Sequence, residues 1–525
     1  MNGIWKYARI FSFLLVIVLL LGAAGTYAQD SDRFGGTFKA AMTTKPPTLD
    51  PYLSTNTVLR QVASYMFESL VTFDENYQVI PQIARKWEVG EDDLTYTFHL
   101  REGVLFHDGS ELTSEDVVAS FNRYASESVG KERVKLVESI KAVDEYTVQF
   151  KLSEPTLFLT TLAIPDPVFG IMPAEQAAKT DELQGPDELI GTGPYKLVEW
   201  KPDQYVKLTR FDDYVADEGM ERSGLGGKKV AYFDEIQLIP VPEAGSRIAG
   251  IKTGEYHYAE SIPFTEYKNL QSAKRVTPVV VKPKWGLVWE LNQKNAPMDN
   301  VKFRRAVAYA LDMEQVMKGV TFGMETFYRL QPSIFFPEQK TWYTEAGGEH
   351  YNVKDMEKVR ELLDEAGYEN EKITVLSNRD YDWMYKCTLA AVSQLQQAGI
   401  NAEIEFSDWP TQIEKALSMK GWHINQTGWS PRLSPAQLSN SLACDSKFAY
   451  GYCNEEMEEL LSEVVYPYPL EERQEIWRQI QELVWEDVAV IRMGDYFALE
   501  AVAADVKGFE SWYVIPRFWN VWFEG

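Results

Sequence analysis

Residues 94–124 read LTYTFHLREGVLFHDGSELTSEDVVASFNRY and contain a complete strand, turn and helix pattern. Apolar residues alternate with polar ones at the start, which predicts a half-buried strand. They are Leu94, Tyr96, Phe98 and Leu100. A turn is expected at 107–109, because its glycine tolerates a positive φ. Thr113 with Asp116 three residues later predicts the capped start of a helix, whose apolar face then continues to Tyr124.

Two histidines and an aspartate lie close together in this stretch, in a chain with only five histidines. His99 falls on the polar side of the predicted strand, and His107 and Asp108 occupy the turn. No third or fourth ligand follows at a spacing suited to a metal site. We therefore interpret these residues as framework of the fold rather than as a metal or catalytic site.

A second marker is Gly191-Thr192-Gly193-Pro194-Tyr195, which precedes a predicted strand. A phosphate-binding loop would open a helix, whereas proline and a strand follow here. The segment instead indicates a tight crossing between chain segments.

The second half of the chain alternates predicted strands and helices. Residues 373–377 are typical of a buried strand, 383–398 of a helix that ends at Gly399, and 402–406 of the next strand. Such a unit of about 35 residues implies that its two strands are parallel. Apolar residues at helical spacing predict further helices near 303–311, 356–366 and 476–484. An α/β fold is therefore expected.

The first 28 residues have the pattern of a cleavable signal peptide. Lys6 and Arg9 precede an apolar run, 10–21, and small residues lead to an expected cut after Ala28. The run is short for a membrane span of about 20 residues, and no cysteine follows it to carry a lipid. We expect an exported protein without a lipid anchor, with an uncleaved membrane anchor as the alternative.

The mature chain is large and acidic. At roughly 500 residues it is expected to form two or more lobes. Loss of Lys6 and Arg9 would change the formal net charge from −26 to −28. Such a charge disfavours nucleic acid and anionic membrane surfaces as partners.

Three cysteines remain after the leader: Cys387, Cys444 and Cys453. Export permits a disulfide, and we predict one between Cys444 and Cys453, which enclose a short loop. Cys387 lies on the apolar face of a predicted helix and is expected to be buried. No histidine lies near the Cys444–Cys453 pair, which makes it a poor zinc site.

Several ordered motifs resemble those of the family 5 extracellular solute-binding proteins, the peptide and nickel type. The resemblance covers nearly all of the mature chain, and 94–124 together with GTGPY make it specific. The other matching stretches are PPTLDPY at 46–52, YMFESLVTFD at 65–74, KFRRAVAYALDMEQVMKGV at 302–320, KVRELLDEAGY at 358–368 and GYCNEEMEELL at 451–461.

The resemblance implies a hinged, two-lobed periplasmic-binding-protein fold with three domains, of the large peptide-binding type. Domain I is expected to be discontinuous, at 29–68, 188–281 and 492–525. Domain II is expected at 69–187 and domain III at 282–491.

The resemblance also implies a monomeric receptor in the periplasm. It would capture a small peptide-like or other polar or anionic organic solute between its lobes. It would then deliver this solute to the membrane permease subunits of an ATP-binding-cassette importer. No catalytic activity, cofactor, metal ion or nucleic-acid partner is expected.

Arg379 and Tyr381 form the first candidate ligand-binding stretch. In the dipeptide-binding members an Arg-x-Tyr after a domain III strand holds the ligand carboxylate, and Arg379-Asp380-Tyr381 matches it. Arginine suits this role because its planar fork donates two hydrogen bonds to one carboxylate. The alternatives are a structural salt bridge for Arg379 and packing at a helix entrance for Tyr381.

Trp429 and Arg432 form the second candidate stretch. Peptide-binding members carry Gly-Trp here, followed by an aspartate that pairs with the ligand α-ammonium. This chain keeps Gly428-Trp429 but has Arg432 near the position of that aspartate, and no acid occurs before Cys444. A ligand with a carboxylate, a phosphate or dense hydroxyls would suit Arg379 and Arg432 better than an ordinary free-amine peptide. The alternative is that Arg432 points to solvent.

Three alternatives to this function or ligand remain. An exported carbohydrate-active hydrolase would use paired carboxylates, but no Gly-x-Ser-x-Gly, His-Glu-x-x-His or cysteine–histidine signature appears. A metal chelate or haem is an alternative ligand, although five scattered histidines disfavour direct protein–metal bonds. A chaperone-like or sensory protein without a ligand would lack a closing cleft.

Overall fold

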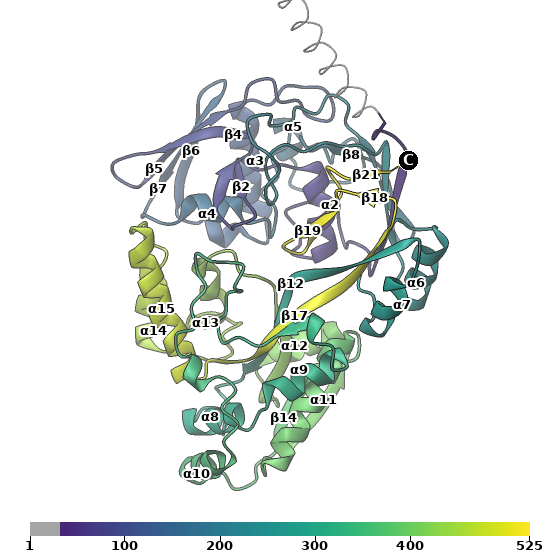
Figure 1. Ribbon diagram of the computed structural model, residues 1–525. Coiled ribbons are helices and arrows are strands. Elements are labelled where there is room, and N and C mark those ends of the chain that lie inside the picture. The colour runs from purple at the N-terminus through teal and green to yellow at the C-terminus, as the bar shows by residue number, and fades with distance from the viewer. Residues whose placement is uncertain (1–31, 525) are drawn as a thin grey trace, which may run out of the picture.

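The computed structural model describes residues 32–524 and shows two lobes joined by a pair of long strands (Figure 1). The predicted signal peptide lies outside the described residues. The joining strands are β12 (Val276–Leu291) and β17 (Val490–Ala503), which pair antiparallel along most of their length. We call β12 and β17 the hinge strands.

The first lobe contains the N-terminal half of the chain and its C-terminal end. Its part of the main sheet is β1 (Thr37–Met42), β8 (Tyr195–Lys201), β9 (Tyr205–Arg210), β10 (Glu235–Pro240) and β11 (Tyr258–Ala259). Its other strands there are β18 (Val506–Lys507), β19 (Glu510–Trp512), β20 (Ile515–Arg517) and β21 (Trp522–Phe523). Its helices there are α2 (Thr57–Met66), α6 (Ala244–Thr253) and α7 (Tyr267–Gln271).

A separate four-stranded sheet belongs to the same lobe, in the order β4-β5-β7-β6. These strands are β4 (Ala84–Val89), β5 (Thr95–Leu100), β6 (Val137–Asp144) and β7 (Thr147–Leu152). Near them lie β2 (Val71–Phe73), β3 (Val79–Pro81), α3 (Ser114–Glu127), α4 (Phe158–Ala163) and α5 (Ala174–Ala177). One hydrophobic core runs through both sheets of the lobe.

The second lobe contains β14 (Ile373–Asn378), β15 (Ala402–Ser407) and β16 (Ile424–Trp429), beside the ends of the hinge strands. Its helices and short edge strand are α8 (Val301–Tyr309), α9 (Met313–Thr321), β13 (Tyr328–Arg329), α10 (Met356–Ala366), α11 (Asp382–Gln397), α12 (Trp409–Ser418), α13 (Ser439–Leu442), α14 (Glu455–Glu463) and α15 (Leu470–Glu486). Leu287 and Trp289 of β12 face the core under α8–α11, and Val288 faces the core under α14 and α15. Helices therefore cover both faces of this sheet, as its α/β sequence pattern predicted.

The strand, turn and helix predicted for 94–124 are confirmed as β5 and α3, and Thr113 and Asp116 form a capping box at the start of α3. The parallel βαβ unit is also confirmed, since β14 and β15 pair in parallel around α11. Cys387 is buried on α11, as expected. The predicted disulfide joins Cys444 to Cys453.

His107 is framework, and it connects the two marker motifs. Its Nδ1 accepts from the Gly191 N–H at 3.2 Å, and its Nε2 lies 3.0 Å from the Gly193 carbonyl oxygen. A Cβ on Gly191 would lie 2.1 Å from the carbonyl oxygen of Met66 at the end of α2. The crossing predicted for this segment is thus a close backbone contact that only glycine permits.

Another buried contact joins two of the sequence motifs. Arg123 of α3 forms an ion pair with Asp50 of the 46–52 motif, with 2.6 Å between Nη2 and Oδ2. Both side chains are almost wholly buried, so this pair fixes the second sheet of the first lobe against the segment after β1.

The hinge strands change register where they leave the first lobe. Val281 pairs with Ala498 and Trp285 with Tyr496, so the pairing is irregular between these two positions. Irregular pairing locally weakens a ladder and allows it to bend. The connection between the lobes is therefore suited to hinge motion.

Candidate functional site

The carboxyl ends of three parallel strands define the candidate site. β14 pairs in parallel with both β15 and β16, so all three strands end at the same edge of the second lobe. In open α/β sheets this edge is where ligands bind. The segment 379–381 follows β14, Trp409 follows β15, and Trp429 ends β16. The topology thus brings both predicted ligand-binding stretches to one edge.

Arg379 is exposed beyond the end of β14. Its guanidinium carbon lies 4.9 Å from the ring centre of Phe406 and 5.5 Å from that of Tyr385. Within residues 32–524 no carboxylate lies within ion-pair distance of it, so the salt-bridge alternative does not describe this conformation. The guanidinium donors of Arg379 remain available.

Tyr381 precedes α11 and is 43% exposed. Its ring contacts Trp383 and Trp409, at 6.0 and 5.7 Å between ring centres. Burial, Asp380 and Glu260 raise the pKa of its hydroxyl. Glu260 belongs to the first lobe, directly after β11, so Tyr381 lies where the lobes approach each other. Asp380, in turn, accepts from the backbone N–H of Trp409 at 2.7 Å and fixes the start of α12.

Trp429 is buried and donates its indole N–H to Oε1 of Glu290, on β12, at 2.9 Å. Arg432 stacks above this indole, with 5.1 Å from its guanidinium carbon to the ring centre. Nη2 of Arg432 is 3.3 Å from Oγ of Ser441, and its buried Nε has no hydrogen-bond partner among the described residues. Burial lowers the pKa of Arg432, although Tyr513, Glu290 and Asp166 oppose that shift. The solvent-facing alternative for Arg432 is therefore wrong for this structure.

The first lobe brings its own charges to Arg432. Arg60 of α2 pairs with Asp166 at 2.8 Å and lies 5.3 Å from the ring centre of Tyr513. Tyr513 and Asp166 both act electrostatically on Arg432 as well as on Arg60. The Nε and Nη1 atoms of Arg60 are buried and lack hydrogen-bond partners in the part of the chain described. Guanidinium groups from the two lobes thus gather around one carboxylate and one phenol.

A second group of charges lies beside Tyr381. Glu260 accepts from the Gln61 side chain at 3.2 Å and from the Thr43 backbone N–H at 3.1 Å. Burial alone would raise the pKa of Glu260, but Lys284 and these hydrogen bonds hold it below its usual value. Lys284 also pairs with Glu500 at 3.3 Å, where burial and the nearby Glu260 raise the pKa of Glu500. Glu260 is therefore a buried first-lobe carboxylate whose charge acts on Tyr381.

Sequence reasoning did not identify Glu290, Glu260, Asp166 or Arg60. The available signal was an acid or arginine inside an otherwise apolar segment, because such residues are almost never buried without a partner. Glu290 stands in the apolar run Gly286-Leu287-Val288-Trp289-Glu290-Leu291, and Arg60 stands among the buried residues 58–66 of α2.

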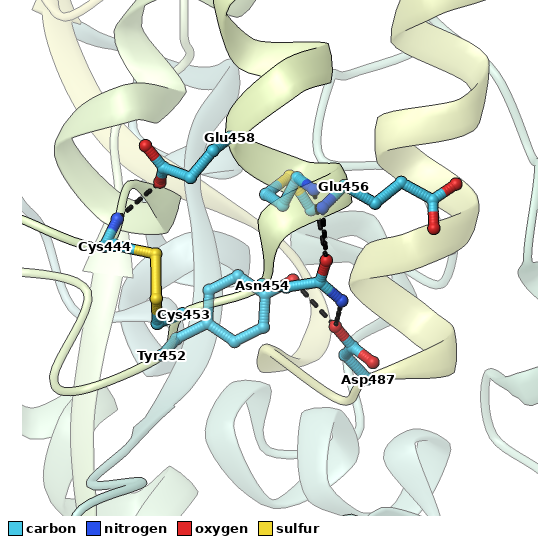
Figure 2. Close-up of a disulfide and its surroundings, with 8 residues drawn as sticks. Cys444, Tyr452, Cys453, Asn454, Glu456, Glu458 and Asp487 are labelled. Atoms are coloured by element: carbon cyan, nitrogen blue, oxygen red, sulfur yellow. Dashed lines mark hydrogen bonds between the residues drawn. A yellow bond between two sulfur atoms is a disulfide. The ribbon is translucent and has the colours of Figure 1, made fainter.

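The disulfide closes a loop beside the site (Figure 2). The Cα atoms of Cys444 and Cys453 are 4.4 Å apart, and the Cys444 N–H donates to Glu458 of α14. Asn454 caps α14 and also donates to Asp487, which accepts from Tyr452 as well. The loop carries Tyr450, whose hydroxyl bonds to Glu290. The disulfide thus anchors a loop that supports the Trp429 side of the site.

A separate groove of about 540 Å³ lies on the β13 side of the hinge strands. Arg329 lines this groove, and its guanidinium donates two hydrogen bonds to Glu338 and one to Asp495, all at 2.8–2.9 Å. Because Arg329 is already saturated by carboxylates, this groove is a poorer site for an anionic solute than the edge carrying Arg379 and Arg432.

Two features are absent from the described residues, 32–524. No three His, Cys, Asp or Glu side chains in that range gather in a way that could hold a metal ion. No helix in that range is both long and apolar enough to cross a membrane.

The fold is that of a two-lobed solute-binding receptor of the kind that serves ATP-binding-cassette importers. Residues 78–449 match the model of the bacterial extracellular solute-binding proteins, family 5. The chain belongs to this family, which consists of binding receptors rather than enzymes. The hydrolase alternative therefore has no support.

Individual relatives agree with this assignment. The chain is 28% identical over 494 residues to the glutathione-binding protein GsiB of Pectobacterium atrosepticum, covering 89% of this chain and 90% of GsiB. Two solved structures share the fold. The Helicobacter pylori DppA complex with the peptide STSA has a TM-score of 0.79 at 23% identity, covering 95% of this chain and 100% of DppA. The AgaA complex with agropinic acid, from A. tumefaciens R10, has a TM-score of 0.76 at 22% identity, covering 93% of this chain and 99% of AgaA.

Proposed function

We propose that the protein binds, between its two lobes, a small peptide or peptide-like solute that carries at least two acidic groups. The observation that supports this ligand most is the pair Arg379 and Arg432, neither of which has a carboxylate at ion-pair distance within residues 32–524. Both stand at the carboxyl edge of the second-lobe strands. Arg379 with Tyr381 would hold one acidic group, and Arg432 with Trp429 the other.

The environment of Arg432 disfavours a ligand ammonium at that end of the site. The sequence places an arginine where peptide-binding members have an acid, and Arg60 of the first lobe adds a second guanidinium nearby. The first-lobe carboxylate that acts on Tyr381, at the other end of the site, is Glu260. An amine on the ligand would therefore be accommodated toward Glu260.

The ligands named for two similar proteins fit this chemistry. GsiB is named for glutathione, a tripeptide with two carboxylates and one ammonium, and AgaA was solved with agropinic acid. We propose a ligand of the same general class here, and glutathione is a natural first probe.

The same proposal includes the biological setting. The protein would act as a monomer in the periplasm and deliver its solute to membrane permease subunits, after removal of residues 1–28. Its domains would be divided at the ranges expected from the sequence. The register shift between Val281 and Trp285 supports a domain border near 281–282.

The proposal is tested by titrating Arg432→Gln by calorimetry with the solute released from the denatured wild-type protein, or with glutathione if none is released. Loss of a charge-assisted pair should weaken binding by about 1.5–3 kcal/mol, or roughly 10- to 150-fold in Kd. Arg473→Gln is a matched control, because Arg473 also stacks on a tryptophan, Trp342, but lies on α15 away from the site. Unchanged affinity in Arg432→Gln would remove Arg432 from the site.

A further inference from the structure

A continuous row of buried hydrogen bonds runs beneath the candidate site, from Tyr381 to Trp429. It passes through Asn378 at the end of β14, Gln412 of α12, Asn425 of β16 and Glu290 of β12. Asn378, Gln412 and Asn425 are at most 1% exposed. Buried amides in such a row are costly unless each is satisfied, which makes their arrangement informative.

The individual bonds are short, and from Tyr381 to Glu290 they all donate in the same direction. The Tyr381 N–H donates to Asn378 Oδ1 at 3.0 Å, and Asn378 Nδ2 donates to Gln412 Oε1 at 2.7 Å. Gln412 Nε2 donates to Asn425 Oδ1 at 2.7 Å, and Asn425 Nδ2 donates to Glu290 Oε2 at 2.9 Å. The Trp429 indole N–H completes the row at Glu290 Oε1, at 2.9 Å.

Backbone groups set the direction of the bonds in the row, because the Tyr381 N–H can only donate and the Gln426 carbonyl, 2.9 Å from Gln412 Nε2, can only accept. Asn378 must therefore turn its oxygen to Tyr381, and Gln412 its NH₂ to Gln426 and Asn425. Asn425 then presents its oxygen to Gln412 and its NH₂ to Glu290. The two backbone groups thus fix the orientation of three amides, and Glu290 supplies the acceptor that the last of them requires.

We infer that Glu290, Asn425, Gln412 and Asn378 are positioning residues that hold the Tyr381 and Trp429 ends of the ligand site in one fixed arrangement. The inference rests on the proposed function, because it concerns the same two ends of the site. At one end the row orients the start of α11, where Arg379 and Tyr381 stand. At the other it orients the indole on which Arg432 stacks. The two acidic groups of a ligand would therefore meet a site whose spacing is fixed before binding.

Glu290→Gln removes one acceptor from the end of the row without changing the size of the side chain. A glutamine at 290 has one accepting oxygen, which cannot serve both the Trp429 indole and the Asn425 amide on its two sides. The row cannot reverse, because Gln412 Nε2 also donates to the Gln426 carbonyl, so a buried donor is left without an acceptor and weakens the row. We expect the backbone amides at the start of α11 to exchange with deuterium about tenfold faster.

A second substitution restores the row. In Glu290→Gln with Asn425→Asp, the carboxylate moves one position along. The new carboxylate at position 425 accepts from Gln412 and from the glutamine introduced at position 290, and that glutamine accepts from the Trp429 indole. Every donor regains an acceptor, so exchange at the start of α11 should return to the wild-type rate. Asn425→Asp alone places two carboxylates against each other and should not behave like the double variant.

Gln412→Met tests the link to binding without changing charge. It removes the central amide, and we expect Kd for the released solute, or for glutathione if none is released, to rise about tenfold. Gln481→Met is the matched control. Gln481 is a fully buried glutamine of the same lobe, and its side chain bonds to the Ile334 N–H and the Pro332 carbonyl outside the row. Its loss should lower stability without changing Kd.

Hydrogen exchange followed by mass spectrometry of peptides covering 379–386 decides the inference in the ligand-free protein. A faster rate in Glu290→Gln, restored in the double variant and absent in Gln481→Met, supports it. A rate that is unchanged in Glu290→Gln, or not restored in the double variant, overturns it, as does an unchanged Kd in Gln412→Met. A wild-type protein that binds no acidic solute would instead overturn the proposed function. The exchange rates would still show whether the row of hydrogen bonds holds the start of α11 in place.

Discussion

Protonation of His107 should destabilise the protein, and substitution of this residue isolates the effect. The neutral ring accepts from the Gly191 N–H through Nδ1, so its proton lies on Nε2 and is donated to the Gly193 carbonyl. Protonation would place a second N–H on Nδ1, facing the Gly191 N–H. His107→Gln keeps one acceptor and one donor at the end of the side chain but does not titrate between pH 4 and 8.

The magnitude follows from the shifted pKa. Burial lowers the pKa of His107 from 6.5 to about 4, although the Gly193 hydrogen bond opposes the shift. Since one pKa unit is worth about 1.36 kcal/mol, this difference corresponds to about 3 kcal/mol. The folded-state pKa lies below the unfolded one, so the stabilisation is present above pH 6.5 and is lost as pH falls toward 4.

Urea unfolding of the wild type and His107→Gln between pH 7.5 and 4 measures this contribution. The other titrating groups are common to both proteins and cancel in the difference. We expect the wild type to lose about 3 kcal/mol more than the variant across this range. Parallel pH profiles for the two proteins would refute the account of His107 as a neutral link between the two marker motifs.

Three further predictions concern the fold and the site. Cys444→Ser with Cys453→Ser should lower the free energy of unfolding by about 2–3 kcal/mol and make thermal stability insensitive to a reducing agent; equal melting temperatures would contradict this. Gly191→Ala should destabilise the protein by about 1–3 kcal/mol, because the new Cβ would meet the Met66 carbonyl. Gly319→Ala is the control and should be tolerated, because its Cβ would lie 3.4 Å from Ala390. Thermal denaturation compares the two variants. Arg379→Ala should weaken ligand binding by about 1.5–3 kcal/mol in a calorimetric titration, and an unchanged affinity would exclude it from the site.

Much of the framework could be predicted from the sequence, because local patterns determine it. Alternation in 94–100 specified β5, the Thr113–Asp116 cap specified the start of α3, and the apolar run at 373–377 specified β14. These signals depend on neighbours within a few residues, so one chain is sufficient to recognise them. The parallel pairing of β14 and β15 followed from the helix between them.

The polar residues beneath the site could not be predicted in the same way. Glu290 meets Trp429 across 139 residues, and Gln412 meets Asn378 across 34. The apolar run around Glu290 marks it as a buried acid, but nothing local identifies its partners, and nothing local distinguishes Gln412 from a surface polar residue. The resemblance to a known family directed attention to Arg379 and Trp429, but the polar row beneath them became visible only from the structure.

The absence of an acid after Trp429 could be seen in the sequence, but the charges around Trp429 could not. The sequence has Arg432 near that position and no acid before Cys444. The structure places a carboxylate, Glu290, beside Trp429 from a neighbouring strand, but neutral donors from Trp429, Asn425 and Tyr450 surround it. Burial raises the pKa of Glu290, and it faces the fold rather than a ligand ammonium. The guanidiniums near Trp429, Arg432 and Arg60, come from different lobes and are brought together only by the fold.

In the proposed function, the lobes close on a solute whose acidic groups are held by guanidiniums. Mass spectrometry of the small molecules released when the purified protein is denatured tests it most directly. We predict that the released solute is a single small organic compound with two or more acidic groups. A neutral sugar, or a cationic peptide without a second acid, would contradict the account.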